Sequence, residues 1–363
     1  MWVGQATRPE VPLYNMILTF EIAGDLDVDC FEQALQALLH RSDALRTVIE
    51  LKGGGPVQRV RPPEPFALET VDFTDEADPE VALDAWIDDR KRRQLDLSTA
   101  LLDMALLQPA PDRYVWYLNQ HHLITDIWSV SLIYRHVSTF YTLAQEGRLD
   151  EAPALPAFAD YVAHEQAYRA SDAFKKVEAH WTSMRDALPE LPRLYGRHPE
   201  RETTRTERVR RTLSPALADR LQAVMNRDDI RALTPDLTRY SIVAAVLFAY
   251  MQRVSGQRDL AIGTPSHNRA TEAFKETIGL FIEVFPMQIE IDEDETFASL
   301  IKKVQRQAVQ LLRYAQPGTS SAAANRRYNV LLNYLPVSFA STFGELPMTP
   351  RWIHSGHGDS GHH

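Results

Sequence analysis

Strand-like and helix-like segments alternate on both sides of a stretch rich in proline, arginine and glutamate, residues 188–204. Before it, residues 113–120 are rich in Tyr, Val and Trp, which favours a strand. After it, residues 241–254 are apolar nearly all round, which is typical of a buried helix. The pattern predicts a mixed α/β (α+β) chain of two lobes, residues 1–187 and 205–363, joined by a linker at 188–204.

Shorter signals place further elements along the chain. We expect strands at 14–22, 209–213, 260–263 and 284–291, a turn between strands within 53–66, and amphipathic helices after residue 27 and over 296–314. Ser214-Pro215 combines an N-cap residue with proline at the first helical position. Gly256 stands where the C-cap of the preceding helix belongs.

Charge and cysteine content narrow the class of protein. The 363 residues include 49 acidic and 39 basic ones, a formal net charge of −10, which argues against a nucleic-acid-binding surface. Cys30 is the only cysteine, so the sequence excludes an intramolecular disulfide and a zinc site built on several cysteines. Because we find neither a signal-peptide pattern nor an apolar segment long enough to span a bilayer, we expect a soluble cytoplasmic protein.

The residues most informative about chemistry are His121 and His122, followed by Asp126. A strand-like segment leads into the pair and a helical one leads out, which places the histidines on a loop at the end of a sheet. Adjacent side chains on extended backbone point in opposite directions, so one imidazole can face a cavity and move protons while the other packs inside. A buried Asp126 would need a cationic partner and would brace the loop. Spacing alone is equally consistent with a buried histidine pair beside an N-capping aspartate.

Other candidate sites are weaker. His354, His357, His362 and His363 cluster near the C-terminus in a Gly/Ser-rich context, but only Asp359 is at hand to complete a ligand set, so we predict no bound metal. A phosphate-binding glycine loop, a nucleophile elbow and a dinucleotide fingerprint are all missing from the sequence, which argues against nucleotide chemistry.

The segment from His121 to Ser129 resembles the His-His-x-x-x-Asp-Gly motif of condensation domains of nonribosomal peptide synthetases, relatives of chloramphenicol acetyltransferase. Further segments resemble that family's motifs in the same order, along nearly the whole chain. They are residues 1–15, 40–47 (HRSDALRT), 158–161 (FADY), 255–259 (SGQRD), 263–265 with Arg269, 278–281 (IGLF), and 328–334 (YNVLLNY), which resembles a strand after the last motif.

The resemblance implies two acetyltransferase-like lobes in a V arrangement with a central tunnel. Phosphopantetheine arms of a donor and an acceptor carrier protein would enter from opposite mouths and meet at His122. Asp126 would pair with Arg269 of the second lobe, and Asp126 and His121 would mainly support the loop. The resemblance therefore implies a catalytic group of His122, His121 and Asp126, with Arg269 as structural support and with no bound cofactor, nucleic acid or membrane.

The reaction implied by the resemblance is attack of an acceptor amine, or a hydroxyl, on a donor acyl or peptidyl thioester in nonribosomal peptide or hybrid polyketide biosynthesis. Two alternatives stay open, a catalytically silent domain that docks partner proteins and an epimerisation domain, although the glutamate-bearing motif of the latter is not recognised here. Docking of an acidic carrier would need a local basic patch. The runs at 90–93 and 208–211 are candidates, unless they are simply solvated faces.

Three features depart from the family pattern. Ile127 replaces the glycine after the aspartate, and its β-branched side chain narrows the space and stiffens the loop. Glu283 stands where the fifth motif has asparagine, either near the tunnel, where it would attract a cationic acceptor, or on the surface. The chain begins inside the first motif and stops soon after the last, so we expect the second lobe to be incomplete at its end. The expected tunnel residues are Ile127, Trp128, Ser129, Glu283 and Asn333.

Overall fold

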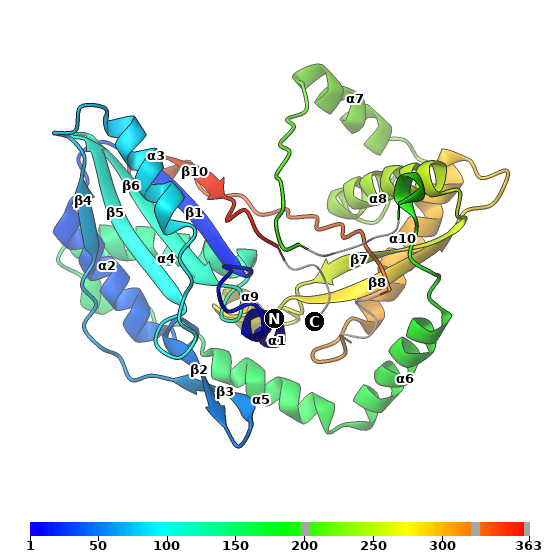
Figure 1. Ribbon diagram of the computed structural model, residues 1–363, viewed down its shortest axis with the longest axis horizontal. Helices are drawn as coiled ribbons and strands as arrows, with labels where there is room; N and C mark the ends of the chain where they lie inside the picture. The colour runs from blue at the N-terminus through cyan, green and yellow to red at the C-terminus, as the bar shows by residue number, and fades with distance from the viewer. Residues whose placement is uncertain (198–202, 321–326, 359–363) are drawn as a thin grey trace.

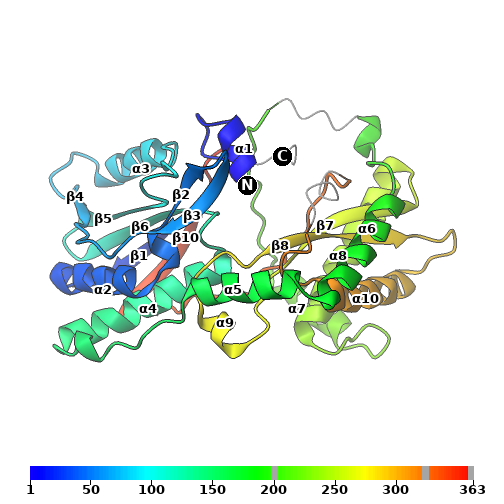
Figure 2. The same ribbon diagram turned by 90° about the horizontal axis from the view of Figure 1, so that it is seen from below.

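A computed structural model describes residues 1–197, 203–320 and 327–358. They form two groups of elements, which Figure 1 shows side by side. The first group surrounds a six-stranded sheet and the second contains a two-stranded sheet. Helix α5 (Phe158–Arg169) runs from one group towards the other, as Figure 2 shows from below. The mixture of helices and strands confirms the predicted α/β class.

The larger sheet has the strand order β4-β5-β6-β1-β10-β9. Its strands are β1 (Asn15–Ala23), β4 (Glu69–Asp72), β5 (Leu102–Ala110), β6 (Arg113–His121), β9 (Thr342–Phe343) and β10 (Leu346–Ile353). All neighbours are antiparallel except β4 and β5. The second lobe was predicted over 205–363, but β9 and β10 belong to this first sheet, where β10 pairs directly with β1.

Two hydrophobic cores cover the two faces of this sheet. Helices α2 (Val28–Arg41) and α4 (Ile127–Gln145) pack on one face, and α3 (Pro79–Arg90) packs on the other. Along β6, Trp116 belongs to the α2–α4 core and Tyr117 to the α3 core, because successive side chains of a strand point to opposite faces. The other elements of this group are α1 (Trp2–Thr7), η1 (Ala44–Arg46), β2 (Thr47–Lys52), β3 (Gly55–Val60) and η2 (Leu149–Glu151). The turn predicted within 53–66 is confirmed between β2 and β3.

The second group has its own core, in which α8 and α10 pack with the antiparallel pair β7-β8. Its elements are α6 (Asp172–Ala187), η3 (Leu194–Gly196), α7 (Pro215–Met225), α8 (Pro235–Ser255), β7 (Asp259–Ser266), α9 (Glu272–Glu276), β8 (Glu283–Glu290) and α10 (Phe297–Tyr314). The predicted helix ends are confirmed. The Ser214 side chain caps α7, and Gly256 ends α8 in the left-handed conformation with φ 74°.

Two predicted strands of the second lobe do not form as expected. Residues 209–213 are exposed and pair with no described strand, so that prediction is wrong. The segment 328–334 makes only a single bridge, between Leu331 and Gly263. Residues 198–202 of the predicted linker lie outside the described residues, and the division into two lobes at 188–204 stays a prediction.

None of the helices in the described ranges is long and apolar enough to cross a membrane. Of the predicted C-terminal histidine cluster, Asp359, His362 and His363 lie outside the described residues. The rings of His354 and His357 hydrogen-bond with the hydroxyls of Thr206 and Thr204, respectively.

Candidate functional site

The backbone of the histidine pair is held at the end of β6 by flanking chain segments. His121 is the last residue of β6 and lies opposite Asn15 of β1. Its N–H donates to the carbonyl oxygen of Leu101 at 2.9 Å, and the N–H of His122 donates to the carbonyl oxygen of Tyr14 at 2.8 Å. The two residues differ in burial, since His121 is 1% exposed and His122 is half-buried.

The His121 ring supports the turn that follows. Its Nδ1 accepts a hydrogen bond from the N–H of Leu123 at 3.1 Å, and the ring packs against that of Tyr14. Burial is the main cause that lowers the pKa of His121 to about 3, so the ring is neutral near pH 7. Because Nδ1 accepts, the ring proton must lie on Nε2. These contacts agree with the supporting role expected for His121.

Acid is expected to destabilise the fold through His121. The unfolded chain binds a proton on this ring below about pH 6.5, whereas the folded protein resists protonation down to about pH 3. The free energy of unfolding is therefore unaffected by this ring above about pH 6.5. Below that pH it falls by up to about 1.4 kcal/mol per pH unit. Urea unfolding between pH 7 and 4 measures this slope, and His121→Gln, which cannot titrate, should show a smaller one. An equal slope in both proteins would contradict the prediction.

The two nitrogens of the His122 ring differ in burial. Its Nδ1 is buried without a hydrogen-bond partner, and Nε2 makes no hydrogen bond to any described residue. Burial lowers the pKa of His122, and the nearby Asp126 carboxylate opposes that effect. A neutral imidazole with a free nitrogen can accept a proton or a hydrogen bond.

Asp126 joins the histidine loop to the second group of elements. It is the N-cap of α4 and accepts from the N–H of Ser129 at 2.8 Å. The same carboxylate accepts from Arg269 Nη2 at 3.0 Å and from the N–H of Phe281 at 3.2 Å. The Asp126 side chain is 2% exposed and that of Arg269 is 0% exposed, so this is a buried ion pair. The pairing expected from the resemblance is therefore present in the structure.

Arg269 also organises the segment around it. Its Nη1 donates to the carbonyl oxygens of Phe274 and Thr277 at 2.7 and 2.6 Å. The guanidinium carbon lies 3.9 Å from the centre of the Phe281 ring, close enough for a cation–π contact. Burial lowers the pKa of Arg269, and the Asp126 carboxylate opposes that effect. An arginine side chain stays protonated in proteins, so the pair is ionic.

Three further contacts join α4 to residues 275–279, and none of them could be predicted individually from the sequence. The Ser129 hydroxyl donates to the carbonyl oxygen of Gly279 at 2.7 Å and accepts from its N–H at 3.0 Å. The Trp128 indole N–H donates to the carbonyl oxygen of Lys275 at 2.8 Å. Arg135 forms an exposed ion pair with Glu276. Ser129 is thus fully engaged within this contact and has no free polar atom for a substrate.

Sequence motifs that lie far apart converge beside this contact. Asp43 accepts from the N–H groups of Phe158 and Ala159 at 2.8 and 2.9 Å, and so fixes the start of α5. A Cβ atom on Gly279 would lie only 2.0 Å from the Phe158 ring, so glycine is needed for this close approach. The matched segments 40–47, 158–161 and 278–281 therefore describe one packed unit.

Ile127 begins α4 and does not need the backbone freedom of glycine. It is half-buried and packs against the α2–α4 core. Among the described residues other than glycine, only Tyr195 and Asn268 have positive φ, so the backbone of Ile127 is not strained. The substitution thus adds side-chain volume beside the histidine loop without distorting it.

Glu283 anchors a neighbouring turn. One carboxylate oxygen accepts from Asn268 Nδ2 at 3.0 Å and from the N–H of Gly318 at 2.6 Å, and the other accepts from the N–H of Ser320 at 2.8 Å. Burial raises the pKa of Glu283. The residue is half-buried rather than fully exposed, and its place near a tunnel stays a prediction. Asn333, the last tunnel candidate, is exposed and lies outside the helices and strands.

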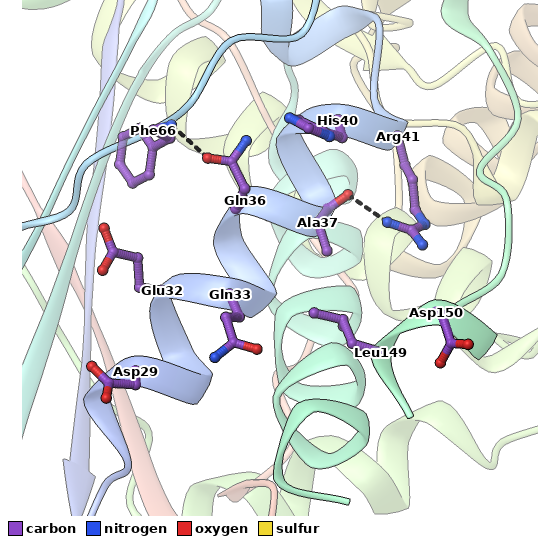
Figure 3. A pocket seen from close by; sticks show the side chains of 10 residues that line it. All are labelled: Asp29, Glu32, Gln33, Gln36, Ala37, His40, Arg41, Phe66, Leu149 and Asp150. Atoms are coloured by element: carbon purple, nitrogen blue, oxygen red, sulfur yellow. Dashed lines mark hydrogen bonds between the residues drawn. The ribbon is translucent and has the colours of Figure 1, made fainter. Parts of the chain in front are cut away.

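A groove of about 610 Å³ lies beside α2, away from the histidines (Figure 3). Its lining residues are Asp29, Glu32, Gln33, Gln36, Ala37, His40, Arg41, Phe66, Leu149 and Asp150. Two of the lining side chains, Glu32 and Gln36, accept hydrogen bonds from the backbone at residues 66–68, so they serve the fold. Within the described ranges, no three His, Cys, Asp or Glu side chains come together as metal ligands would.

A mixed α/β chain with a buried Asp–Arg pair behind a histidine loop defines a class of protein that comparison identifies. The family model of the condensation domain matches residues 1–320, and the chain belongs to this family. The first condensation domain of the CDA synthetase superposes with a TM-score of 0.82 at 24% identity, covering 98% of this chain and 83% of that one. The starter condensation domain of the rhizomide synthetase RzmA gives 0.78 at 22% identity, with 98% and 81% covered.

Among curated proteins, the relatives include large synthetases of which this chain matches only a part. The chain is 28% identical over 305 residues to malpinin synthetase of Mortierella alpina, covering 83% of this chain and 4% of that protein. It is 29% identical over 319 residues to phosphinothricin tripeptide synthetase PhsC of Streptomyces viridochromogenes, covering 86% of this chain and 29% of that protein. The chain thus spans less than a third of the length of either relative.

Proposed function

We propose that this domain joins two carrier-borne building blocks by an amide bond. An acyl or peptidyl group would arrive as a thioester on the phosphopantetheine arm of a donor carrier protein, and an amine on the arm of an acceptor carrier. The observation that carries the proposal is the state of His122. Its ring is neutral, its Nε2 is available, and its loop is braced by the buried Asp126–Arg269 pair.

The chemistry follows from that arrangement. The acceptor nitrogen attacks the thioester carbonyl, a C–N bond forms, the C–S bond breaks, and the donor arm leaves as a thiol. The nitrogen loses one proton, which His122 Nε2 accepts and passes to the departing sulfur. Holding two tethered reactants in place contributes on the order of 7–11 kcal/mol in favourable systems. Proton transfer contributes about 10²–10⁴-fold. Positioning is therefore the larger effect, and a hydroxyl acceptor would depend more on the base than an amine.

Two structural relatives support the assignment of both substrates. A mutant of the rhizomide starter condensation domain was crystallised in complex with C8-CoA and Leu-SNAC. The structure of the first condensation domain of the calcium-dependent antibiotic synthetase was solved in complex with a substrate analogue. By similarity, the passage at His122 would receive an acyl donor and an aminoacyl acceptor.

Intact-mass spectrometry of the two carriers tests this function. After the domain is mixed with an acyl-loaded donor carrier and an aminoacyl-loaded acceptor carrier, the acyl mass should leave the donor and appear on the acceptor. An acceptor mass that stays unchanged would favour a silent docking domain. Incubation with the aminoacyl carrier alone in D₂O separates epimerisation, which would introduce deuterium at the α-carbon without any transfer.

A further inference from the structure

Glu283, the first residue of β8, joins two chain segments that are far apart in the sequence. Its three hydrogen bonds hold Asn268 on one side and the N–H groups of Gly318 and Ser320 on the other. The Ser320 hydroxyl also donates to the carbonyl oxygen of Val284 at 2.9 Å, which closes this turn onto β8. A half-buried carboxylate that accepts three hydrogen bonds connects parts of the fold and is not a solvated surface charge.

Asn268 has an unusual backbone conformation directly before Arg269. Its φ is 47°, in the left-handed region where residues other than glycine are uncommon, and the residue is 8% exposed. Such a conformation persists where the surrounding contacts hold it in place. The amide nitrogen Nδ2 must face Glu283, because the carboxylate would repel the amide oxygen. That oxygen, Oδ1, is buried and accepts no hydrogen bond from a described residue, so Glu283 sets the orientation of the amide.

Arg269 connects this contact with the histidine loop. Its N–H donates to His267 Nδ1 at 3.2 Å, so the backbone turns tightly around Asn268. The direction in which the Arg269 side chain leaves the turn depends on the backbone of Asn268. That side chain forms the buried ion pair with Asp126 behind His122. A change in the hold on Asn268 is therefore passed on to the ion pair.

The surroundings of Glu283 determine when it is charged. Burial raises its pKa, the N–H donors and the Arg169 charge oppose that effect, and the Glu165 charge adds to it. Glu165 and Arg169 of α5 form an ion pair with each other at 2.9 Å, so their charges largely offset one another. The other titratable side chains of the segments packed around the carboxylate are Tyr161, His267 and Arg269. Glu283 is thus ionised near neutral pH but takes up a proton at a higher pH than an exposed glutamate.

We propose that Glu283 is a positioning residue for acyl transfer, which acts through Asn268 and Arg269 while its carboxylate is ionised. The proposal rests on the proposed function and adds to it a residue that acts without touching a substrate. An ionised carboxylate accepts all three hydrogen bonds, whereas a protonated one presents an O–H group to the donors on one side. Protonation therefore loosens the hold on Asn268, and with it the position of the histidine loop.

The ratio of single-turnover transfer rates in the wild type and in Glu283→Gln, at saturating carriers, tests this proposal. The new amide N–H group faces one of the N–H donors, so the variant should transfer about tenfold more slowly at about pH 8. Half-saturating carrier concentrations should stay the same, because no substrate contact is removed. Towards about pH 5 the ratio should decline to near unity, because the wild type then loses the same hydrogen bonds. His122 and the acceptor amine titrate in both reactions and cancel from the ratio.

The variant Asn268→Gly tests whether the effect passes through Asn268. Glycine keeps the left-handed backbone but removes the amide, so this variant should lose a similar factor in rate. Its ratio to the wild type should also decline in acid, which keeps the test valid if Glu283→Gln does not fold. Adding Glu283→Gln to Asn268→Gly should slow transfer by less than about twofold more. The matched control is Glu290→Gln, which removes an exposed carboxylate from the other end of β8 and should transfer at the wild-type rate at every pH.

NMR spectra of the domain with ¹³C-labelled histidine give a second readout that needs no carrier protein. The ring signals of His122, assigned with His122→Ala, should move in Glu283→Gln and in Asn268→Gly but not in Glu290→Gln. Unmoved signals in both variants, a wild-type rate in Glu283→Gln, a rate ratio that is the same at every pH, or additive losses in the double variant would each overturn the proposal. A wild type without any transfer would instead contradict the proposed function, and the NMR comparison would still decide whether Glu283 positions His122.

Discussion

Replacing His122 with alanine is expected to lower the rate of acyl transfer by about 10²–10⁴-fold, the usual contribution of a positioned acid or base. The variant loses Nε2, the nitrogen that we propose contacts the substrate, whereas Nδ1 is buried and the neighbouring His121 ring is held by Leu123. It keeps the Asp126–Arg269 pair. Residual transfer should therefore remain measurable above the reaction without protein.

Single-turnover mixing of loaded donor and acceptor carriers, followed by intact mass, measures this loss. His40→Ala removes an exposed histidine of α2 and should transfer at the wild-type rate. Urea unfolding should show that His122→Ala is folded, so that a slow rate reports chemistry. Transfer by His122→Ala at the wild-type rate would show that this imidazole takes no part in the reaction, whatever else the domain does.

The central site was accessible from the sequence because its parts carry distinct chemical signatures. The local sequence pattern predicts a strand rich in aromatic and β-branched residues that ends at His121. It also predicts an aspartate at the start of the next helix. The partner of Asp126 lies 143 residues away, and only the resemblance to a family supplied Arg269. The contacts of Trp128 and Ser129 with backbone carbonyls had no signal, because a carbonyl acceptor looks the same at every residue.

The sequence did not allow a prediction of which strands form the first sheet. β10 contains two prolines and buries only two of its eight residues, so its sequence does not read as a strand next to the sheet centre. In contrast, residues 209–213 have strand propensity but remain exposed and unpaired with any described strand, because propensity does not supply a partner. The role of Glu283 depends on backbone N–H groups of residues 318 and 320, which only the fold brings to it.

Replacing Arg269 with alanine is expected to cost about 3–5 kcal/mol of stability, the largest loss we predict for a single substitution. The variant leaves the Asp126 carboxylate buried without a cation, and it removes the donors to the carbonyl oxygens of Phe274 and Thr277. Water cannot replace the lost charge readily, since both side chains are almost fully buried. Because these contacts hold residues 274–281 against α4, transfer activity should fall along with stability.

Urea unfolding of a double-mutant cycle separates the ion pair from its surroundings. Asp126→Asn keeps the N-cap oxygen of α4 but strands the Arg269 charge, so it too should be strongly destabilising. Arg269→Met fills the space without a charge. The double variant Asp126→Asn/Arg269→Met should lose clearly less free energy of unfolding than the sum of the losses in the two single variants. Glu276→Ala breaks the exposed Arg135–Glu276 pair between the same segments and should cost no more than about 1 kcal/mol. Additive costs in the cycle would mean that the charges of Asp126 and Arg269 do not stabilise one another. Packing and hydrogen bonds alone would then hold the loop of His122 against residues 274–281.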